Sequence, residues 1–456
     1  MRFNTVKGYN YYLSKMRYLR LVLVLILILG LITGCNKLEK SSSNSNDSSK
    51  DVITTEATYS DEEGTLYDGD EYEDEDKLLS SDLKDGREIE DDIELDDGSE
   101  DIEEDKVTKV DLIMVGDMLL HDPVHESGKY PDGSYNYDHL FMNVKDIISC
   151  SDIAMVNQEV ILGGLELGLS GYPTFNGAYE IADSLVNAGF NVILHATNHT
   201  LDKGKKGVLN CMNYWKTNYP HIGVVGINES QEASEDIYVF KKDDLRIAIL
   251  NYTYGTNGVP IPSDMPYIVN MLEKARIEKD VKKAREIADF IIVAPHWGTE
   301  YMHTPSKEQV ELAMFMADLG VDLVIGTHPH VIQPVEWVES ENGNRMLIYY
   351  SIGNYINSTS SVGDGVTNRM IGAMAKVTIE KHEGEVAYIS EYGAIPLISH
   401  KDTSGPGRLT VYTADDYSEE LAKANEIVKQ DKNFSLELCM DIWNEVYENL
   451  RLADSE

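Results

Sequence analysis

A chain of 456 residues with 79 Asp and Glu against 39 Lys and Arg carries a formal net charge of −40 and is long enough for more than one domain. This balance excludes nucleic acid as a partner, because phosphate backbones are bound by Lys and Arg. The charge is unevenly spread: residues 51–105 hold 26 acidic side chains against Lys77, Lys84 and Arg87, an excess of 23.

Residues 1–35 have the pattern of an export signal. Basic residues without any acidic one precede an apolar run over 21–31, which is short for a bilayer span and is followed by Ile32-Thr33-Gly34-Cys35. That ending resembles the lipobox of bacterial lipoproteins, which implies cleavage before Cys35 and a diacylglycerol on its thiol. The alternative is an uncleaved amino-terminal membrane anchor. Either way, we expect the remainder on the extracytoplasmic face of the cell membrane.

Residues 36–106 begin with a Ser/Asn run over 41–49 and continue as blocks of Asp and Glu, such as 71–76. Such a segment buries too little apolar surface to offset its ordering entropy, so the composition predicts a disordered, self-repelling tether. Calcium binding is the weaker alternative, because no spaced calcium loop is present.

From residue 107 onward, short apolar runs with the length and branching of buried strands alternate with helical patterns. The runs are 110–115, 153–156, 192–194, 247–250, 290–294, 321–325 and 346–350. This alternation predicts an open α/β sheet covered by helices on both faces. Residues 373–379 and 387–389 instead indicate an antiparallel hairpin near the sheet edge.

The clearest helix is predicted over 306–319. Ser306 and Gln309 form a capping-box pattern, and Gly320 ends the helix. Its expected apolar stripe consists of Val310, Ala313, Met314 and Ala317. The main domain is expected over 107–400, and 401–456 is expected to be a helical extension packed on it, with helices near 418–429 and 436–450.

A polar group follows each predicted strand. Because the carboxyl ends of strands in an open α/β sheet line one crevice, we expect these groups to lie together. Singly, each has a simpler explanation as a helix cap, a turn or a hydrogen-bonded core imidazole. The groups are Asp117, Asn157, Glu159, Asn198, His199, Asn257, His296, Glu300, His328, His330 and Asn354.

Imidazoles, carboxylates and an amide oxygen form a ligand set suited to a divalent Mn, Fe, Zn or Mg ion, with no thiolate to favour a softer one. In His328-Pro329-His330, the two imidazoles flank a proline at a strand-to-loop junction. That spacing predicts a rigid pair pointing to one side.

Six motifs in order resemble those of the bacterial capsule synthesis protein CapA family of the poly-γ-glutamate system. They are Gly116-Asp117, Asn157-Gln158-Glu159, the stretch 198–204, the stretch 296–301, the stretch 326–336 and the stretch 350–354. That family looks like a divergent branch of the calcineurin-like metallophosphoesterases. The resemblance therefore implies an α/β fold of four layers, an α/β/β/α sandwich with a second sheet, over about 108–400.

The resemblance also implies a ligand set for the metal ion, consisting of Asp117, Asn198, His199, His296, His328 and His330, with Asn157 near the bridging position. Two departures matter. Leu119 stands where metallophosphoesterases have a histidine, and Asn157 and Glu159 stand where they have a bridging aspartate. A standard two-metal centre is therefore in doubt.

By this resemblance the protein takes part in the synthesis, export or retention of an anionic surface polymer, with capsule-synthesis membrane proteins as further partners. For a hydrolase, the candidate acids are His199 and His296, and the candidate bases are Glu159 and Glu300. One alternative is a surface phosphoesterase acting on phosphorylated substrates unrelated to capsule. The other is a non-catalytic scaffold that binds polymer or assembles partner proteins.

An acidic protein that handles an anionic polymer needs local basic groups. The candidates are Lys203, Lys205, Lys206, Arg345 and Arg369. A solvated lysine face is the alternative interpretation for the lysines.

Overall fold

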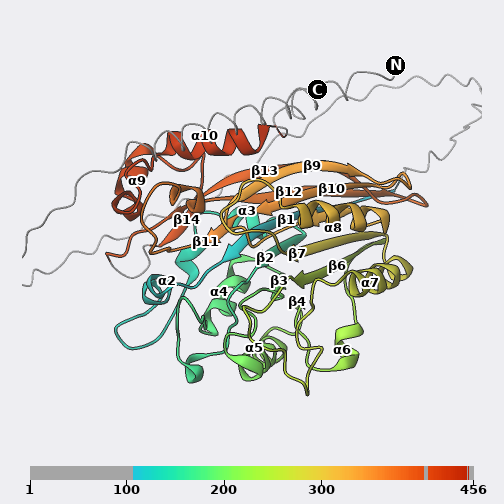
Figure 1. Cartoon of the computed structure of the whole chain (residues 1–456), viewed down its shortest axis with the longest axis horizontal. Coiled ribbons are helices and arrows are strands. Elements are labelled where there is room, and N and C mark those ends of the chain that lie inside the picture. The colour runs from blue at the N-terminus through green and yellow to red at the C-terminus, as the bar shows by residue number, and fades with distance from the viewer. Residues whose placement is uncertain (1–105, 405–408, 449, 451–456) are drawn as a thin grey trace, which may run out of the picture. The chain divides into compact units, whose positions relative to one another are not determined.

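The computed structural model describes residues 106–404, 409–448 and 450. The predicted export signal, Cys35 and the tether as far as residue 105 lie outside these residues. Within the described part, no helix combines the length and the apolar character needed to cross a membrane. From Val107 onward the chain forms two β-sheets with covering helices (Figure 1).

The first sheet has eight strands, in the order β14-β13-β12-β1-β2-β3-β4, with β11 paired to β1 beside this path. They are β1 (Val107–Met118), β2 (Ile153–Asn157), β3 (Val192–Leu194), β4 (Gly223–Val225), β11 (Asn354–Ile356), β12 (Ile371–His382), β13 (Tyr388–His400) and β14 (Thr410–Thr413). β1 to β4 are parallel, whereas β12, β13 and β14 add antiparallel pairs. The predicted hairpin is confirmed as β12 and β13.

The second sheet has six strands, in the order β5-β6-β7-β8-β10-β9. They are β5 (Tyr238–Lys242), β6 (Leu245–Thr253), β7 (Phe290–His296), β8 (Leu323–Ile325), β9 (Ile332–Glu339) and β10 (Arg345–Ile352). β6, β7, β8 and β10 form its parallel part. All of the predicted strands therefore exist.

The prediction of one open sheet from the strand pattern was wrong, because the strands divide between two stacked sheets. The composition of a strand shows that it is buried on both faces, but it does not show which other strand pairs with it. Leu112 and Met114 on β1 face the core between the sheets, whereas Ile113 and Val115 face the outer helices. The second sheet that the family resemblance implied is confirmed.

Helices complete the four layers (Figure 1). α4 and α5 pack on the outer face of the first sheet, and α7 and α8 pack on that of the second. The helices are α2 (Asp122–Ser127), α3 (Lys145–Ser149), α4 (Glu180–Ala188), α5 (Gly204–Asn218), α6 (Gln231–Glu235), α7 (Lys274–Ile287), α8 (Lys307–Asp318), α9 (Glu419–Ala424) and α10 (Leu436–Val446), with 3₁₀ turns η1 (Asp138–Leu140), η2 (Leu165–Leu167), η3 (Thr367–Met370) and η4 (Glu426–Lys429).

α8 has the predicted capping box, in which Ser306 and Gln309 bond reciprocally, and Gly320 follows it with φ 83°. Its buried face differs from the predicted stripe, because Val310 and Met314 are exposed and Met316 is buried. Gln309 points inward and donates a hydrogen bond to Gln333. The buried face of α8 therefore consists of positions 309, 313, 316 and 317.

The segment after residue 400 contains a strand, β14, that the sequence pattern did not predict, followed by α9, η4 and α10. β14 extends the first sheet by pairing with β13. Cys439 and Trp443 on α10 belong to the hydrophobic core that lies between the sheets.

Gly116 sets the position of the polar end of β1. A Cβ at this residue would lie 1.9 Å from the carbonyl oxygen of Gly353, and that same carbonyl accepts a hydrogen bond of 3.0 Å from the Asp117 amide. Only glycine permits this close approach of β1 to the turn before β11.

We therefore expect Gly116→Ala to lower the free energy of unfolding by about 1–3 kcal/mol, because backbone must move to admit the methyl group. Urea denaturation followed by circular dichroism measures this. Gly393→Ala is the matched control, since an added Cβ there meets no heavy atom within 4 Å. Equal stability of the two variants would contradict the packing argument.

Candidate metal centre

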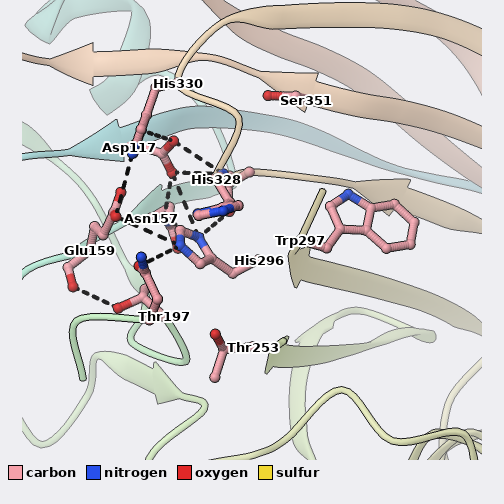
Figure 2. A network of polar contacts seen from close by, with 12 residues as sticks. Asp117, Asn157, Glu159, Thr197, Thr253, His296, Trp297, His328, His330 and Ser351 are labelled. Carbon is pink, nitrogen blue, oxygen red and sulfur yellow. Dashed lines mark hydrogen bonds and ion pairs between the residues drawn. The ribbon is translucent and has the colours of Figure 1, made fainter. Parts of the chain in front are cut away.

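The strand-end side chains predicted to form one site lie together, where the parallel strands of both sheets end (Figure 2). Asp117, Asn157, Glu159, Asn198 and His199 come from β1 to β3 and the loops after them. His296 ends β7, and His328 and His330 lie in the loop after β8. The site therefore joins the two sheets at one end of the sandwich.

The Asp117 carboxylate is fully buried and is the centre of the hydrogen-bond network. Its Oδ1 accepts a bond of 2.7 Å from Asn157 Nδ2 in the first sheet. Its Oδ2 accepts from the His328 amide at 3.1 Å and lies 3.0 Å from His330 Nδ1, both in the loop after β8 of the second sheet. These contacts run from the end of β1 to β2 on one side and to the loop after β8 on the other, so they tie the two sheets together.

His328 and His330 have positive φ angles of 98° and 59°. Non-glycine residues in this region cost about 1–3 kcal/mol each and persist where their surroundings hold them. Here the bonds to Asp117 hold both residues, which places the two rings 5.8 Å apart between centroids.

Burial favours the neutral form of the His296 and His328 imidazoles. Burial, with neighbouring histidines, lowers the pKa of His296 well below its usual range and that of His328 to about 3. His296 has partners for both ring nitrogens, namely Thr327 Oγ1 at 3.0 Å and Asn198 Oδ1 at 3.0 Å. In contrast, His328 Nδ1 is buried and has no hydrogen-bond partner in the described chain. Neutral imidazole is the form that binds metal ions.

Glu159 is a buried carboxylate whose two oxygens both lack a hydrogen-bond partner among the described residues. Its Oε1 lies 3.7 Å from His296 Nε2, 3.8 Å from His330 Nε2 and 4.0 Å from His199 Nε2, all too long for hydrogen bonds. Burial raises the pKa of Glu159 well above its usual range, His330 opposes this, and the Asp117 carboxylate adds to it.

The pKa of His330 is raised as well, but here the cause is the neighbouring carboxylates. Burial acts to lower its pKa, but Glu159 and Asp117 outweigh burial and raise the pKa to about 9. The cluster thus contains buried acceptor atoms, above all the two oxygens of Glu159, that no hydrogen-bond donor of the described residues satisfies. Leaving such groups unpaired is costly, and a cation removes the cost.

These donors fit a divalent cation. Ligand atoms of Glu159, His296 and His328 lie within 4.8 Å of one another, as do those of Asp117, Glu159 and His330, and those of Glu300, His328 and His330. Carboxylate oxygen with imidazole nitrogen suits Zn²⁺, Mn²⁺ or Fe²⁺, and Mg²⁺ less well. The unpartnered oxygens of Glu159 and Nδ1 of His328 are the observations that support the fit.

His199 is oriented by Asp202, whose Oδ2 lies 2.7 Å from His199 Nδ1. Asp202 also accepts a bond of 2.7 Å from the Phe175 amide, so its carboxylate is fixed. Nε2 of His199 is therefore the ring nitrogen that faces Glu159. The simpler explanation of Asn198 and His199 as a helix cap is wrong, because neither residue caps α5.

A cavity of about 270 Å³, called the cleft below, adjoins the cluster. Leu119, His199, Glu300 and His330 contribute to its walls. Leu119, which replaces the expected histidine, is 6% exposed and packs in the outer core. Glu300 is exposed at the cleft rather than buried with Glu159.

Sequence reasoning missed Thr327 and gave no role to Tyr254. Thr327 Oγ1 contacts His296 Nδ1, and the Tyr254 ring centroid lies 4.6 Å from that of His328. Tyr254 directly follows β6, and Thr327 lies two residues after the end of β8. Their position in these strand-end loops was the signal that the sequence offered. Their hydroxyl groups gave no reason to choose them over other loop residues.

The chain thus has the four-layered α/β/β/α architecture that the family resemblance implied, with a cluster of histidines and carboxylates where the strands end. The family model described as bacterial capsule synthesis protein PGA_cap matches residues 111–359, which is over half of the chain. The protein belongs to this family, and the resemblance based on the six motifs is confirmed.

Two curated relatives share moderate identity with this chain. The capsule biosynthesis protein CapA of Bacillus anthracis is 29% identical over 258 residues, covering 54% of this chain and 60% of that protein. The PGA biosynthesis protein CapA of Bacillus subtilis (strain 168) is 28% identical over 293 residues, covering 58% and 68%. The match thus spans less than two thirds of the first relative. The solved NAD nucleotidase NadN of Haemophilus influenzae aligns with 75% of this chain and 67% of its own, at 13% identity and a TM-score of 0.41.

We expect His328→Ala and Glu159→Gln each to weaken binding of Mn²⁺ or Zn²⁺ by at least about tenfold, because each removes an unpartnered ligand atom. Equilibrium dialysis with elemental analysis measures this. His221→Ala, at an exposed histidine away from the cluster, is the control. If all three variants bind metal as the unmodified protein does, the cluster is not a metal site.

Proposed function

We propose that the protein takes part in the synthesis, export or retention of an anionic surface polymer of the poly-γ-glutamate type, and that the strand-end cluster is a metal-dependent hydrolytic site. Family membership and the two CapA relatives, a capsule biosynthesis protein and a PGA biosynthesis protein, support the first part. The buried, unpartnered carboxylate of Glu159 beside neutral His328 carries the second.

In this proposal Asp117, Glu159, His328 and His330 hold the cation, with His296 and Asn157 beside them. When bound, a divalent cation acidifies water and polarises a phosphoryl or carbonyl group. Asp117 keeps the loop with His328 and His330 in its strained conformation. Burial of the cluster limits the water that competes for these side chains.

His199 is the stronger of the two candidate acids. Its Nδ1 is engaged by Asp202, and it contributes to the wall of the cleft, so Nε2 can hold a proton beside a bound substrate. His296 is completely buried, and both of its nitrogens have protein partners. In hydrolysis, the water oxygen bonds to the carbonyl carbon or phosphorus and gives a proton to Glu300, the candidate base that lines the cleft. The scissile bond breaks, and His199 protonates the leaving atom.

A second candidate function is a non-catalytic scaffold that binds polymer or assembles partner proteins. The observation that favours it is Leu119, an apolar side chain in the cleft wall where metallophosphoesterases have a histidine. A phosphoesterase unrelated to capsule is the remaining alternative.

One experiment separates these functions. The metal-loaded protein is incubated with poly-γ-glutamate, whose length is followed by size-exclusion chromatography, and with bis-p-nitrophenyl phosphate. Metal-dependent shortening of the polymer supports the proposal, and cleavage of the phosphodiester alone favours the unrelated phosphoesterase. Binding of the polymer with no cleavage of either compound favours the scaffold.

We expect His199→Ala to lower kcat by roughly 10²–10⁴ with metal content unchanged, because proton transfer contributes a factor of that size. Asp202→Asn should produce a smaller loss in the same direction, since Asp202 only orients the ring. Initial rates and elemental analysis on the same samples measure both. Unchanged kcat in His199→Ala would exclude this residue as the acid.

The proposal places the protein at the outer face of the cell membrane through a lipid on Cys35, with other capsule-synthesis membrane proteins as partners. We expect Cys35→Ser to move the protein from the membrane fraction, as followed by fractionation of cells. Cys150→Ser, at an exposed cysteine of the folded domain, is the control. If Cys35→Ser stays in the membrane fraction, the uncleaved anchor replaces the lipid.

A further inference from the structure

The cleft beside the metal cluster has a basic wall that the proposed hydrolytic site does not use. Arg369 and Tyr301 line the cleft together with His199 and His330 from the cluster. Of the five basic residues considered as polymer contacts, Arg369 is the one in this wall. Lys205 instead pairs with Asp264 at 2.5 Å.

The Arg369 guanidinium is held in place but not neutralised. It lies over the Tyr301 ring, 3.7 Å from the centroid. Its Nη1 donates to Thr359 Oγ1 at 3.3 Å and to Ser361 Oγ at 2.8 Å, whereas its Nε has no partner in the described residues. Within residues 106–404, 409–448 and 450, no carboxylate forms an ion pair with this guanidinium.

The backbones of Arg369 and Tyr301 are tied to the metal cluster. Asn354 Nδ2 donates to the Arg369 carbonyl at 2.9 Å and to the His330 carbonyl at 3.2 Å. The Tyr301 amide donates to the Pro329 carbonyl at 2.7 Å, and Tyr301 has a positive φ of 65°. The basic wall therefore keeps a fixed position relative to His328-Pro329-His330.

Asn354 provides a second unsatisfied group in this wall. It is 2% exposed and lines the cleft, and its Oδ1 has no hydrogen-bond partner among the described residues. A buried amide acceptor and an unneutralised guanidinium on one wall match a ligand that carries an oxyanion and a neighbouring N–H or O–H donor.

We propose that Arg369, stacked on Tyr301, forms an oxyanion subsite that orients an anionic group of the substrate beside the metal cluster. This inference rests on the proposed function and adds a specificity-determining residue to it. The planar guanidinium matches a carboxylate in geometry, so the favoured ligand is a chain with a free carboxylate next to the reacting group. Phosphate shares the oxyanion chemistry, and the test separates the two.

The test measures binding to the metal-loaded full chain by isothermal titration calorimetry, with a γ-linked glutamate pentamer in one arm and inorganic phosphate in the other. We expect Arg369→Gln to weaken binding of the pentamer about tenfold or more with metal content unchanged. A loss confined to the pentamer identifies a carboxylate subsite, and a loss in both arms identifies a general oxyanion subsite. Both outcomes support the proposal.

Arg345→Gln is the matched control, because Arg345 also stacks on an aromatic ring, with its guanidinium 4.2 Å from the Trp337 centroid, but does not line the cleft. Arg369→Lys keeps the charge without the planar fork and should lose less affinity, so it replaces Arg369→Gln if that variant does not fold. Unchanged affinity in a variant with normal metal content overturns the subsite and leaves the metal site standing. Failure of the unmodified protein to bind metal overturns the proposed hydrolytic site instead.

Discussion

The buried carboxylate of Asp117 is the contact on which the rest of the site depends. One oxygen is bonded to Asn157 in the first sheet, and the other contacts the backbone of His328 and the ring of His330 in the second. The same carboxylate therefore connects the two sheets and positions the candidate metal ligands. The contacts of Asp117 also support the positive φ angles of the two histidines.

At two positions the site differs from the ligand pattern that the family resemblance implies. Glu159, two residues after Asn157, brings a carboxylate within 3.7–4.0 Å of three imidazoles, although no aspartate stands at the bridging position. Leu119 stands where a histidine was expected, so the site has one imidazole fewer and the cleft wall is apolar at this position. On the other side, Arg369 supplies the positive charge that a strongly acidic chain needs to hold an anion.

The strands and the strand-end residues were predictable from the sequence, because parallel strands place their carboxyl ends at one edge. The division into two sheets was not, since it depends on which strands pair, and it followed only from the family resemblance. Arg369 was one of five equivalent basic candidates until its stacking on Tyr301 was known. The buried face of α8 was misjudged because Gln309 pairs with Gln333, a contact between distant parts of the chain.

In the proposed site, Asp117, Glu159, His328 and His330 bind a divalent cation. Anomalous diffraction at the absorption edge of Mn or Zn, from crystals of the reconstituted protein, tests it most directly. We expect an anomalous peak at about 2.0–2.2 Å from an oxygen of Glu159 and Nδ1 of His328. A structure with the metal present at saturating concentration, no peak at this cluster and the Glu159 carboxylate satisfied by protein hydrogen bonds would contradict it.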